Sequence, residues 1–416
     1  MRRTFILTAT ILFCLCCQDS SRTTTTAQRK QDAPSREQEA VLSPDWNALA
    51  TPGQGPMATL LSAYDRYFTE ALKQHGIPGA AVVIVKDNNI IFCKGYGERA
   101  AGRNEPIDGS TVFRIGSLSK GFAGVLSSQL EQEGVWHLYD PVQRYFPEFT
   151  LRDKAQAERV TIEHLLSHTS GLPYHAFTNM IEEGHDTRSI ARMLPQVSML
   201  AKEGKLFCYQ NALFSIVGEC MRPATGMSYA EVLESKIFRP AGMSTASVTY
   251  EDMMQNPNKA LPHRGRTVLK INDHYYNSAM AGGINASAAD MGMWLRVLLG
   301  HHPEIVSKDA LDNAFMPRIR SLNERRRFRE WPGHKEAWYA LGWRVLECAY
   351  GDIVCHSGSV NDYRSEIAMN RQDGIGICIL FNVSTPLASS CIPEFFRRYD
   401  DFKNGLSLPL TGLNDF

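Results

Sequence analysis

The chain has 416 residues, and its 44 Lys and Arg residues balance its 44 Asp and Glu residues, with 44% hydrophobic and 21% charged positions. These proportions are typical of a globular protein and exclude disordered, collagen-like and polytopic membrane proteins. A net charge of zero argues against a nucleic-acid partner, which needs a clustered excess of Lys and Arg. The one local basic cluster, residues 325–329, is flanked by Glu324 and Glu330, and we interpret it as a solvated loop.

The N-terminus predicts an export signal, residues 1–17. Arg2 and Arg3 precede an apolar stretch, residues 5–15, that is too short to span a bilayer. The cysteines at its end resemble those of a bacterial lipoprotein signal, with Cys17 as the candidate for lipidation, although Cys14 stands where leucine is usual. We therefore expect an exported protein that is periplasmic or is anchored to the membrane through a lipidated Cys17.

The segment after the signal predicts a flexible tether. Residues 18–55 are rich in Ser, Thr, Gln, Asp and Pro and carry too little apolar surface to fold. We expect the folded domain to comprise residues 56–416.

Hydrophobic periodicity in this domain predicts an α+β fold. Residues 57–74 have helical spacing, and the β-type runs 80–85 and 90–96 flank a hairpin turn. Residues 117–299 are mostly helical in pattern. Near the C-terminus we expect strands at 343–347, 353–356, 363–369 and 376–381 and a helix at 391–402. Together these elements predict an antiparallel sheet lobe (56–116 and 300–416), flanked by N- and C-terminal helices, with a large helical lobe (117–299) inserted.

The cysteines beyond the signal show no CxxC or Cys/His spacing that would indicate a zinc site. Their odd number leaves at least one thiol free within the chain. Cys348 and Cys355 are the pair that a tight hairpin about Gly351 and Asp352 would place opposite each other. We nevertheless interpret them as two buried, unpaired small hydrophobic residues.

Ser117 and Lys120 form the first candidate catalytic pair. They precede a run of helical spacing, and residues three apart at the start of a helix lie on one face, so the amine can reach the hydroxyl. A serine needs a neighbouring base to become a nucleophile, and a desolvated lysine near a helix N-terminus can serve as that base. A serine N-cap beside a surface lysine would leave the same pattern.

Two further motifs follow in order, Tyr209-Gln210-Asn211 and His356-Ser357-Gly358. The ordered set Ser-x-x-Lys, Tyr-x-Asn and Lys/His-x-Gly resembles the serine β-lactamase and penicillin-binding protein superfamily, which includes class C β-lactamases, D,D-peptidases and family VIII esterases. The likeness covers roughly residues 58–400. Further segments typical of that family are residues 116–120, 164–172, 281–285 and 339–343.

This resemblance implies an acyl-enzyme mechanism with no metal or organic cofactor. Ser117 would attack the substrate carbonyl, Lys120 would act as the base, and Tyr209 would pass the proton to the leaving group and later activate water. Asn211 would bind the substrate amide. The N–H groups of Ser117 and Ser359 would form the oxyanion hole, where one donor is worth about 3 kcal/mol, and Gly358 would let substrate lie against the strand, although a strand glycine can also mark a bulge.

His356 departs from the β-lactamase pattern, which usually has lysine. A histidine has a reference pKa of about 6.5 and is mostly neutral at pH 7, so we expect weaker binding of a substrate carboxylate. The family's esterase-like members also carry histidine here, which disfavours strong β-lactam hydrolysis. A histidine that only ends a strand in the core is the alternative.

Other matches are weaker. Tyr275 begins a second Tyr-x-Asn, but it directly precedes the Ala281-Gly282-Gly283 segment and so falls outside the family's order. His164 and His168 have the spacing of a zinc-binding helix without a third ligand, and we interpret them as loop anchors.

The sequence thus predicts an exported serine hydrolase that acts through a Ser117 acyl-enzyme on the amide or ester bonds of a small molecule or peptide, such as a β-lactam or a D-amino-acid peptide. A carboxylesterase of the same family and a penicillin-binding sensor without turnover remain alternatives.

Overall fold

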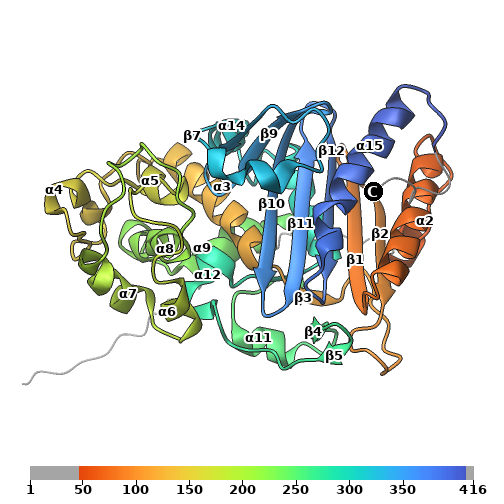
Figure 1. The fold of residues 1–416 in the computed structure, drawn as a ribbon, viewed down its shortest axis with the longest axis horizontal. Helices are drawn as coiled ribbons and strands as arrows, with labels where there is room; N and C mark the ends of the chain where they lie inside the picture. The colour runs from red at the N-terminus through yellow and green to blue at the C-terminus, as the bar shows by residue number, and fades with distance from the viewer. Residues whose placement is uncertain (1–45, 409–416) are drawn as a thin grey trace, which may run out of the picture. The chain divides into compact units, whose positions relative to one another are not determined.

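The computed structural model describes residues 46–408. Its centre is an antiparallel sheet of eight strands in the order β2-β1-β12-β11-β10-β9-β8-β7 (Figure 1). The sheet unites both ends of the folded chain, because β1 pairs with β12 and Ala80 lies opposite Phe381. The strands are β1 Gly79–Lys86, β2 Asn89–Gly97, β7 Ile319–Arg320, β8 Glu336–Tyr339, β9 Arg344–Cys348, β10 Gly351–Val360, β11 Tyr363–Asn370 and β12 Ile375–Phe381. The predicted α+β fold is confirmed.

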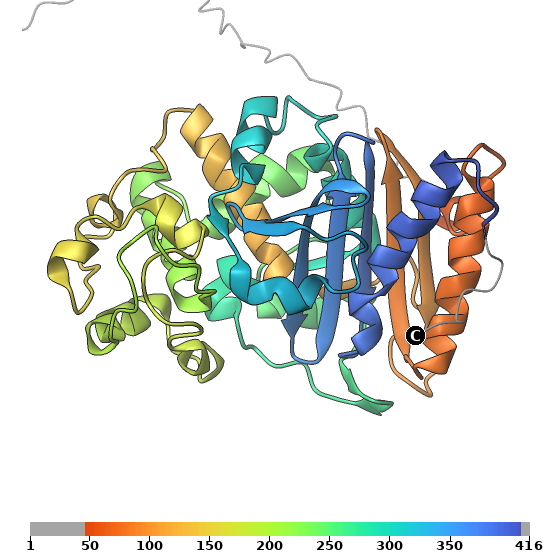
Figure 2. The ribbon, with the colours of Figure 1, turned by 45° about the horizontal axis from the view of Figure 1, so that its top comes forward.

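Helices α2 (Ala58–Gln74) and α15 (Cys391–Lys403) cover one face of this sheet. Figure 2 shows the two together on the side away from the helical lobe. Alternating residues of β1 and β12, such as Val82 and Ile379, pack with Phe68 of α2 and Phe395 of α15. Because successive strand residues point to opposite faces, the residues between them face the other core. This double coverage explains why the β1 run is apolar throughout.

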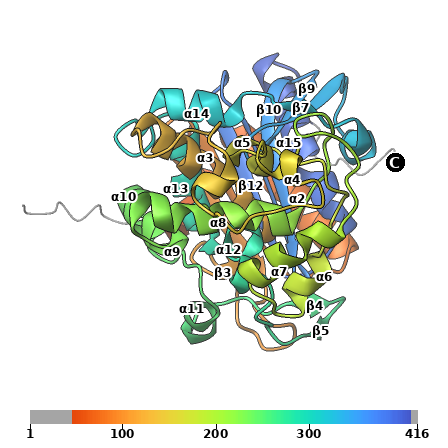
Figure 3. The same cartoon turned by 90° about the vertical axis from the view of Figure 1, so that its left-hand side faces the viewer.

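The helical lobe covers the other face (Figure 3). Ala81, Val83 and Leu380 of the sheet share one continuous core with residues of this lobe, such as Phe122 and Trp294. The principal helices of the lobe are α3 Ser119–Gln132, α5 Ile162–Leu166, α6 Thr178–Glu182, α7 Thr187–Met193, α8 Asn211–Thr225, α9 Tyr229–Leu233, α11 Tyr250–Gln255, α12 Ala279–Gly282, α13 Ala288–Leu298 and α14 Lys308–Phe315. Shorter helical elements are α4 Lys154–Ala157, α10 Arg239–Ala241, the 3-10 turns η1 Gly116–Leu118, η2 Val142–Arg144, η3 Leu194–Gln196 and η5 Tyr276–Ser278, and the π-helical turn η4 Glu234–Phe238.

Several short elements differ from the expected pattern. The mostly helical segment also contains the strand pair β4 (His263–Arg264) and β5 (Thr267–Val268), and β3 (Val112–Arg114) pairs with β6 (Asn285–Ser287). Strands β7 and β8 were not predicted, because runs of two and four residues are too short for a periodic signal. The 3-10 turn η6 (Leu322–Phe328) lies between them, and the 3-10 turn η7 (Pro386–Ser389) precedes α15.

Ordered structure begins before residue 56. Helix α1 (Trp46–Leu49) lies inside the expected tether, and both Trp46 and Leu49 pack against the core. The tether prediction is therefore wrong for these residues, since two apolar side chains give them surface to bury. The predicted signal, Cys17 and residues 18–45 lie outside the described residues. No helix within residues 46–408 combines the length and apolar character needed to cross a membrane.

The cysteines of residues 46–408 are free and buried. The interpretation of Cys348 and Cys355 as two buried, unpaired residues is confirmed, and the hairpin turns earlier than their pairing would require. Cys348 lies opposite Gly351, and Arg344 lies opposite Cys355.

Candidate active site

Ser117 and Lys120 lie where the sheet meets the helical lobe. Gly116 has φ +51 and starts the turn η1, which carries Ser117 and leads directly into α3. A positive φ is easily adopted by glycine, so the turn can be this tight. The Lys120 Nζ atom lies 3.1 Å from Ser117 Oγ, and Lys120 is fully buried. The structure therefore brings the predicted nucleophile and base together, and Ser117 is not the N-cap of α3.

The amine of Lys120 has three neutral oxygen partners. Besides Ser117 Oγ, it lies 2.8 Å from Asn211 Oδ1 and 2.6 Å from the carbonyl oxygen of Ala281. Burial lowers the pKa of Lys120 well below its usual value, and the positive charge of Arg344 lowers it further. A neutral amine has two N–H donors and one lone pair. It can therefore donate to Asn211 and Ala281 and accept the proton of Ser117.

Tyr209 lies two residues before the start of α8, and its hydroxyl shares a hydrogen bond with Ser117. Its ring lies with its centroid 4.9 Å from Lys120 Nζ. Burial raises the pKa of Tyr209 to about 12, while Arg344 and the hydrogen bond with Ser117 oppose that rise. His168 holds the segment in place, because its Nδ1 accepts the N–H of Gln210 at 3.2 Å and its ring lies 4.3 Å from that of Tyr209. The three groups Ser117, Lys120 and Tyr209 thus form one contact cluster.

Asn211 is oriented by the tyrosine that the motif order had set aside. Its Oδ1 faces Lys120, and its Nδ2 donates to the Tyr275 hydroxyl at 3.2 Å. That hydroxyl donates in turn to Glu182 at 3.3 Å. The side-chain amide of Asn211 has a second N–H, which can donate a hydrogen bond to a substrate oxygen. Tyr275 itself has φ +70, a conformation uncommon for a residue with a side chain.

Strand β10 approaches the serine turn backbone to backbone. A Cβ atom on Gly116 would lie 2.8 Å from the Ser359 nitrogen, and one on Gly358 would lie 2.1 Å from the Ile115 carbonyl oxygen. Both glycines are therefore required for this approach, which brings the backbone of Ser359 beside that of the turn bearing Ser117. The pairing of β9 with β10 ends at Cys355, so the following residues of β10 extend beyond β9.

His356 is neutral, with its proton on Nδ1. Nδ1 lies 2.8 Å from the Ser357 carbonyl oxygen, to which it can only donate. Nε2 lies 3.0 Å from both Arg344 Nη1 and the Tyr339 hydroxyl. Because a guanidinium cannot accept a hydrogen bond, Nε2 must be the acceptor. Burial lowers the pKa of His356 well below its usual value, and the nearby Arg344 lowers it further.

Arg344 and Glu324 were missed by the sequence analysis. Arg344 is 3% exposed at its side chain and forms two hydrogen bonds to Glu324, of 2.8 and 2.5 Å. Burial alone would lower the pKa of Arg344, but Glu324 raises it above its ordinary value. The family-like segment 339–343 ends one residue before Arg344, which was the available signal. Arginine and glutamate separated along the chain give no pattern that predicts a pair.

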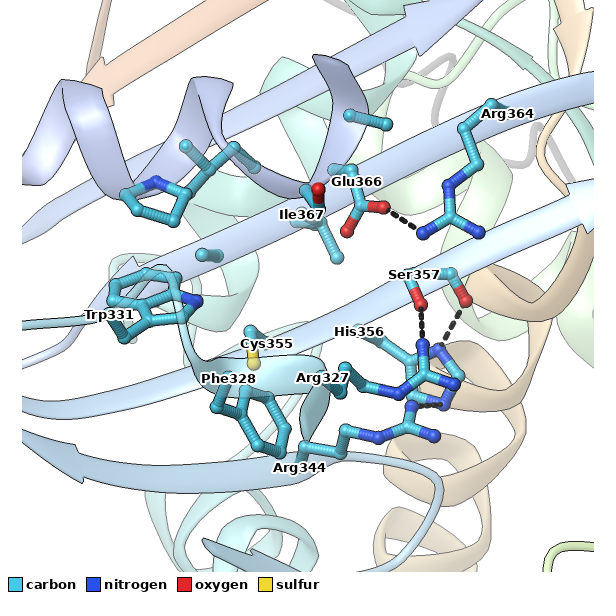
Figure 4. A pocket seen from close by; sticks show the side chains of 15 residues that line it. Arg327, Phe328, Trp331, Arg344, Cys355, His356, Ser357, Arg364, Glu366 and Ile367 are labelled. Atoms are coloured by element: carbon cyan, nitrogen blue, oxygen red, sulfur yellow. Dashed lines mark hydrogen bonds and ion pairs between the residues drawn. The ribbon is translucent and has the colours of Figure 1, made fainter. Parts of the chain in front are cut away.

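The basic cluster is not simply a solvated loop. Arg327 of η6 donates to Ser357 Oγ at 3.0 Å and lies 3.2 Å from Glu324. Figure 4 shows Arg327 and Arg344 side by side next to His356 and Ser357, at one end of a pocket. The pocket encloses about 450 Å³ up to its open mouth and is also lined by Trp331, Arg364 and Glu366. The side chain of Arg327 is 43% exposed, so it remains accessible from solvent.

The two histidines with zinc-like spacing have other partners. His164 Nδ1 accepts the backbone N–H of Thr161 at 3.1 Å, as part of the cap of α5. His168 donates from Nε2 to the Tyr339 hydroxyl at 3.2 Å. His164 thus anchors local backbone as expected, whereas His168 also packs on Tyr209 of the site. Among the residues that the structure describes, no cluster of His, Cys, Asp and Glu could hold a metal ion.

Comparisons with known proteins identify the family of the chain. The β-lactamase family model matches residues 64–397. Protein flp of Staphylococcus aureus strain MRSA252 is 25% identical over 77% of this chain and 62% of its own length. Unguisins hydrolase ungD' of Aspergillus campestris is 26% identical over 78% of this chain and 62% of its own. The chain thus spans less than two thirds of these relatives.

A solved structure supports the fold. The octameric penicillin-binding protein homologue from Pyrococcus abyssi superimposes with a TM-score of 0.71 at 24% identity, over 84% of this chain and 78% of that one. The family model covers most of the sequence, and the sheet with its inserted helical lobe has a matching architecture. The chain therefore belongs to the β-lactamase family, within the superfamily of serine β-lactamases and penicillin-binding proteins.

Proposed function

We propose that this protein is a serine hydrolase that forms an acyl-enzyme on Ser117 with an ester or amide substrate. The observation that carries the proposal is the buried Lys120 amine, 3.1 Å from Ser117 Oγ and bound otherwise only to neutral oxygens. Such a site favours the neutral amine, which can take the serine proton. β-Lactams and D-amino-acid peptides are the amide substrates that this family membership suggests.

The proposed reaction has two steps. In acylation, Ser117 Oγ bonds to the acyl carbon and its proton passes to Lys120. Tyr209 gives its own proton to the alcohol or amine as the bond between that group and the acyl carbon breaks, and Lys120 returns a proton to Tyr209. In deacylation, the same pair removes a proton from water, water oxygen bonds to the acyl carbon, and Ser117 recovers its proton as the acid is released. The N–H groups of Ser117 and Ser359 would bind the oxyanion in both steps.

A carboxylesterase is the second candidate, and the neutral His356 favours it. The family's usual lysine would offer a charge to a substrate carboxylate, whereas burial and the positive charge of Arg344 lower the pKa of His356 and keep its ring neutral. A histidine in place of lysine would therefore weaken the binding of neutral esters less than the binding of β-lactams, which carry a carboxylate.

One experiment separates these functions. The purified protein and Ser117→Ala would be incubated with a fluorescent penicillin, a chromogenic cephalosporin and a neutral p-nitrophenyl ester. We expect ester turnover in the wild type and a loss of at least about 10³-fold in Ser117→Ala, since the residual rate would come from binding groups alone. Cephalosporin turnover faster than ester turnover would favour a β-lactamase, and stable penicillin labelling without turnover would favour a sensor or slow peptidase. Full activity in Ser117→Ala would contradict the assignment.

We further propose export, with Cys17 as the lipidated residue. The proposal rests on the N-terminal sequence pattern alone. Mass spectrometry of the protein from bacterial membranes would detect a diacylglyceryl group on Cys17, and an unmodified N-terminus at another residue would contradict lipidation.

A further inference from the structure

The candidate active site contains a buried cation whose position the family motifs do not assign. Arg344 lies at the start of β9, its guanidinium centre 5.4 Å from the Tyr209 ring and 5.3 Å from the Tyr339 ring. Its Nη1 reaches His356, while its Nε and Nη2 bind both carboxylate oxygens of Glu324. A bidentate pair of this kind fixes the guanidinium plane as well as its position.

We propose that Arg344, held in place by Glu324, is a positioning residue. It supplies a positive charge beside Tyr209, which the neutral ring of His356 does not supply. This proposal rests on the proposed acyl-enzyme function. It assigns Arg344 two effects: it fixes the His356 tautomer, and it favours the neutral form of Lys120 and the ionised form of Tyr209.

The charge of Arg344 is only partly cancelled by its partner. Glu324 is shared by two guanidiniums, because Arg327 Nε lies 3.2 Å from the same carboxylate. One negative charge against two positive charges leaves a net positive cluster beside Tyr209. Arg344 is the buried member, and buried charges are screened least by solvent and salt.

A chain of hydrogen bonds connects this cluster to the backbone next to Tyr209. Arg344 donates to His356 Nε2, which also accepts from the Tyr339 hydroxyl. Tyr339 accepts from His168, and His168 accepts the N–H of Gln210, next to Tyr209. Removing Arg344 would leave His356 Nε2 with one donor instead of two and allow the ring to change tautomer or protonate.

The effect on pH dependence has a definite sign. The titratable and charged groups facing Lys120 and Tyr209 come from η1, the loop after α5, η6 and strands β8, β9 and β10. Arg344 lowers the pKa of Lys120 and also that of Tyr209. Without it both values rise, so the base becomes protonated at a higher pH. With Tyr275 from the segment before η5, the groups that face Lys120 and Tyr209 are Ser117, His168, His175, Glu324, Arg327, Tyr339, Arg344 and His356.

The test compares variants that remove the charge with one that keeps it. Arg344→Met is combined with Glu324→Gln, so that no unpaired carboxylate stays buried. Arg344→Lys keeps the charge but loses the bidentate geometry. The matched control is Arg318→Met with Glu163→Gln, a pair at 2.8 Å with side chains 11% and 15% exposed outside the catalytic cluster.

The readout is kcat/KM for a neutral ester between about pH 5 and about pH 9, with thermal melting as the folding control. We expect the acid limb of the Met/Gln variant to move to higher pH, by up to about one unit, because Arg344 acts directly on the pKa of Lys120 whereas Glu324 does not. Arg344→Lys and the control pair should keep the wild-type limb. An unshifted limb in a folded Met/Gln variant, or an equal shift in the control pair, would overturn the proposal.

One measurement on the wild type keeps the proposal testable if the Met/Gln variant folds poorly, and a further variant extends the test if it folds. Imidazole ¹⁵N NMR of the wild type should show His356 neutral and protonated at Nδ1, and a proton on Nε2 would overturn it, because Arg344 could not then donate. In the Met/Gln background, His356→Lys restores a cation near Tyr209 and should move the acid limb back toward wild type. Ser117→Ala separates these outcomes from failure of the proposed function, because it tests the nucleophile alone.

Discussion

The buried charges beside Ser117 behave differently from the same residue types at the surface. Burial and the positive charge of Arg344 lower the pKa of Lys120, and Tyr209 remains protonated because burial raises its pKa to about 12. An amine with a lowered pKa beside a phenol with a raised pKa can exchange a proton with it in either direction through the Ser117 hydroxyl. His356 adds no charge, so the nearby guanidiniums are the cations available to the site.

Arg327 is the member of this cluster that a substrate could reach. It is half exposed and bonded to Ser357 on the part of β10 that extends beyond β9. We expect Arg327→Gln to raise KM about tenfold for esters with a carboxylate near the acyl group and to leave neutral esters unchanged. A charge-assisted hydrogen bond worth about 1.5 kcal/mol gives an effect of this size.

The matched control for Arg327 is Arg329→Gln in the same segment, an arginine that is 78% exposed and paired with Glu330. Steady-state kinetics on the two esters checks the prediction. Equal losses on both esters, or an equal loss in Arg329→Gln, would contradict a specific role for Arg327.

At the scale of elements, helix α3 is fixed against the turn that leads into β9. Trp343 Nε1 donates to the Gly121 carbonyl at 3.1 Å, and a Cβ on Gly342 would lie 2.1 Å from the Lys120 carbonyl oxygen. This contact joins the helix that carries Lys120 to the strand that begins with Arg344. The glycines allow it, because side chains would separate the two backbones.

Gly124→Ala tests this packing. Helix propensity alone predicts that alanine stabilises α3 by about 1 kcal/mol. A Cβ on Gly124 would lie 1.8 Å from the Leu341 carbonyl oxygen, so we expect the free energy of unfolding to fall by about 1–3 kcal/mol instead. Chemical denaturation measures it, with Gln132→Ala at the exposed end of α3 as the control. A variant as stable as wild type would contradict the close approach.

At the scale of the whole folded part, the sheet and the inserted lobe share one core. Residues 46–408 belong to one compact unit, and the core that contains Val83 of β1 also contains Leu165 of α5 and Val217 of α8. The sheet is complete only when β12, near the C-terminus, pairs with β1, near the start of the folded chain. Neither lobe can therefore complete its packing without the other.

This shared core predicts cooperative unfolding. We expect one calorimetric transition, coincident with the loss of near-ultraviolet circular dichroism and of activity, although chains of this length often show more than one. Differential scanning calorimetry of the purified protein checks it. Two resolved transitions, one without loss of the helical signal, would indicate lobes that unfold independently.

The sequence by itself determined the fold class, the strongly periodic elements and the ordered motifs. Helix α2, the hairpin β1–β2 and strands β11 and β12 were predictable because their apolar spacing is local information. Ser117, Lys120, Tyr209 and Asn211 were identified from motif order, and the structure places them in contact. The short strands β7 and β8 and the helix at Trp46 carry too few periodic positions to be recognised.

Only the tertiary structure decided the charges of the site. Glu324 and Arg344 lie on separate elements, and nothing in their sequence neighbourhood indicates that one will clamp the other against His356. The positions of Tyr275 on Asn211 and of Arg327 on Ser357 depend equally on how distant segments pack. Protonation depends on burial and on neighbours in space, which is why the motif residues could be named from the sequence while their charge states could not.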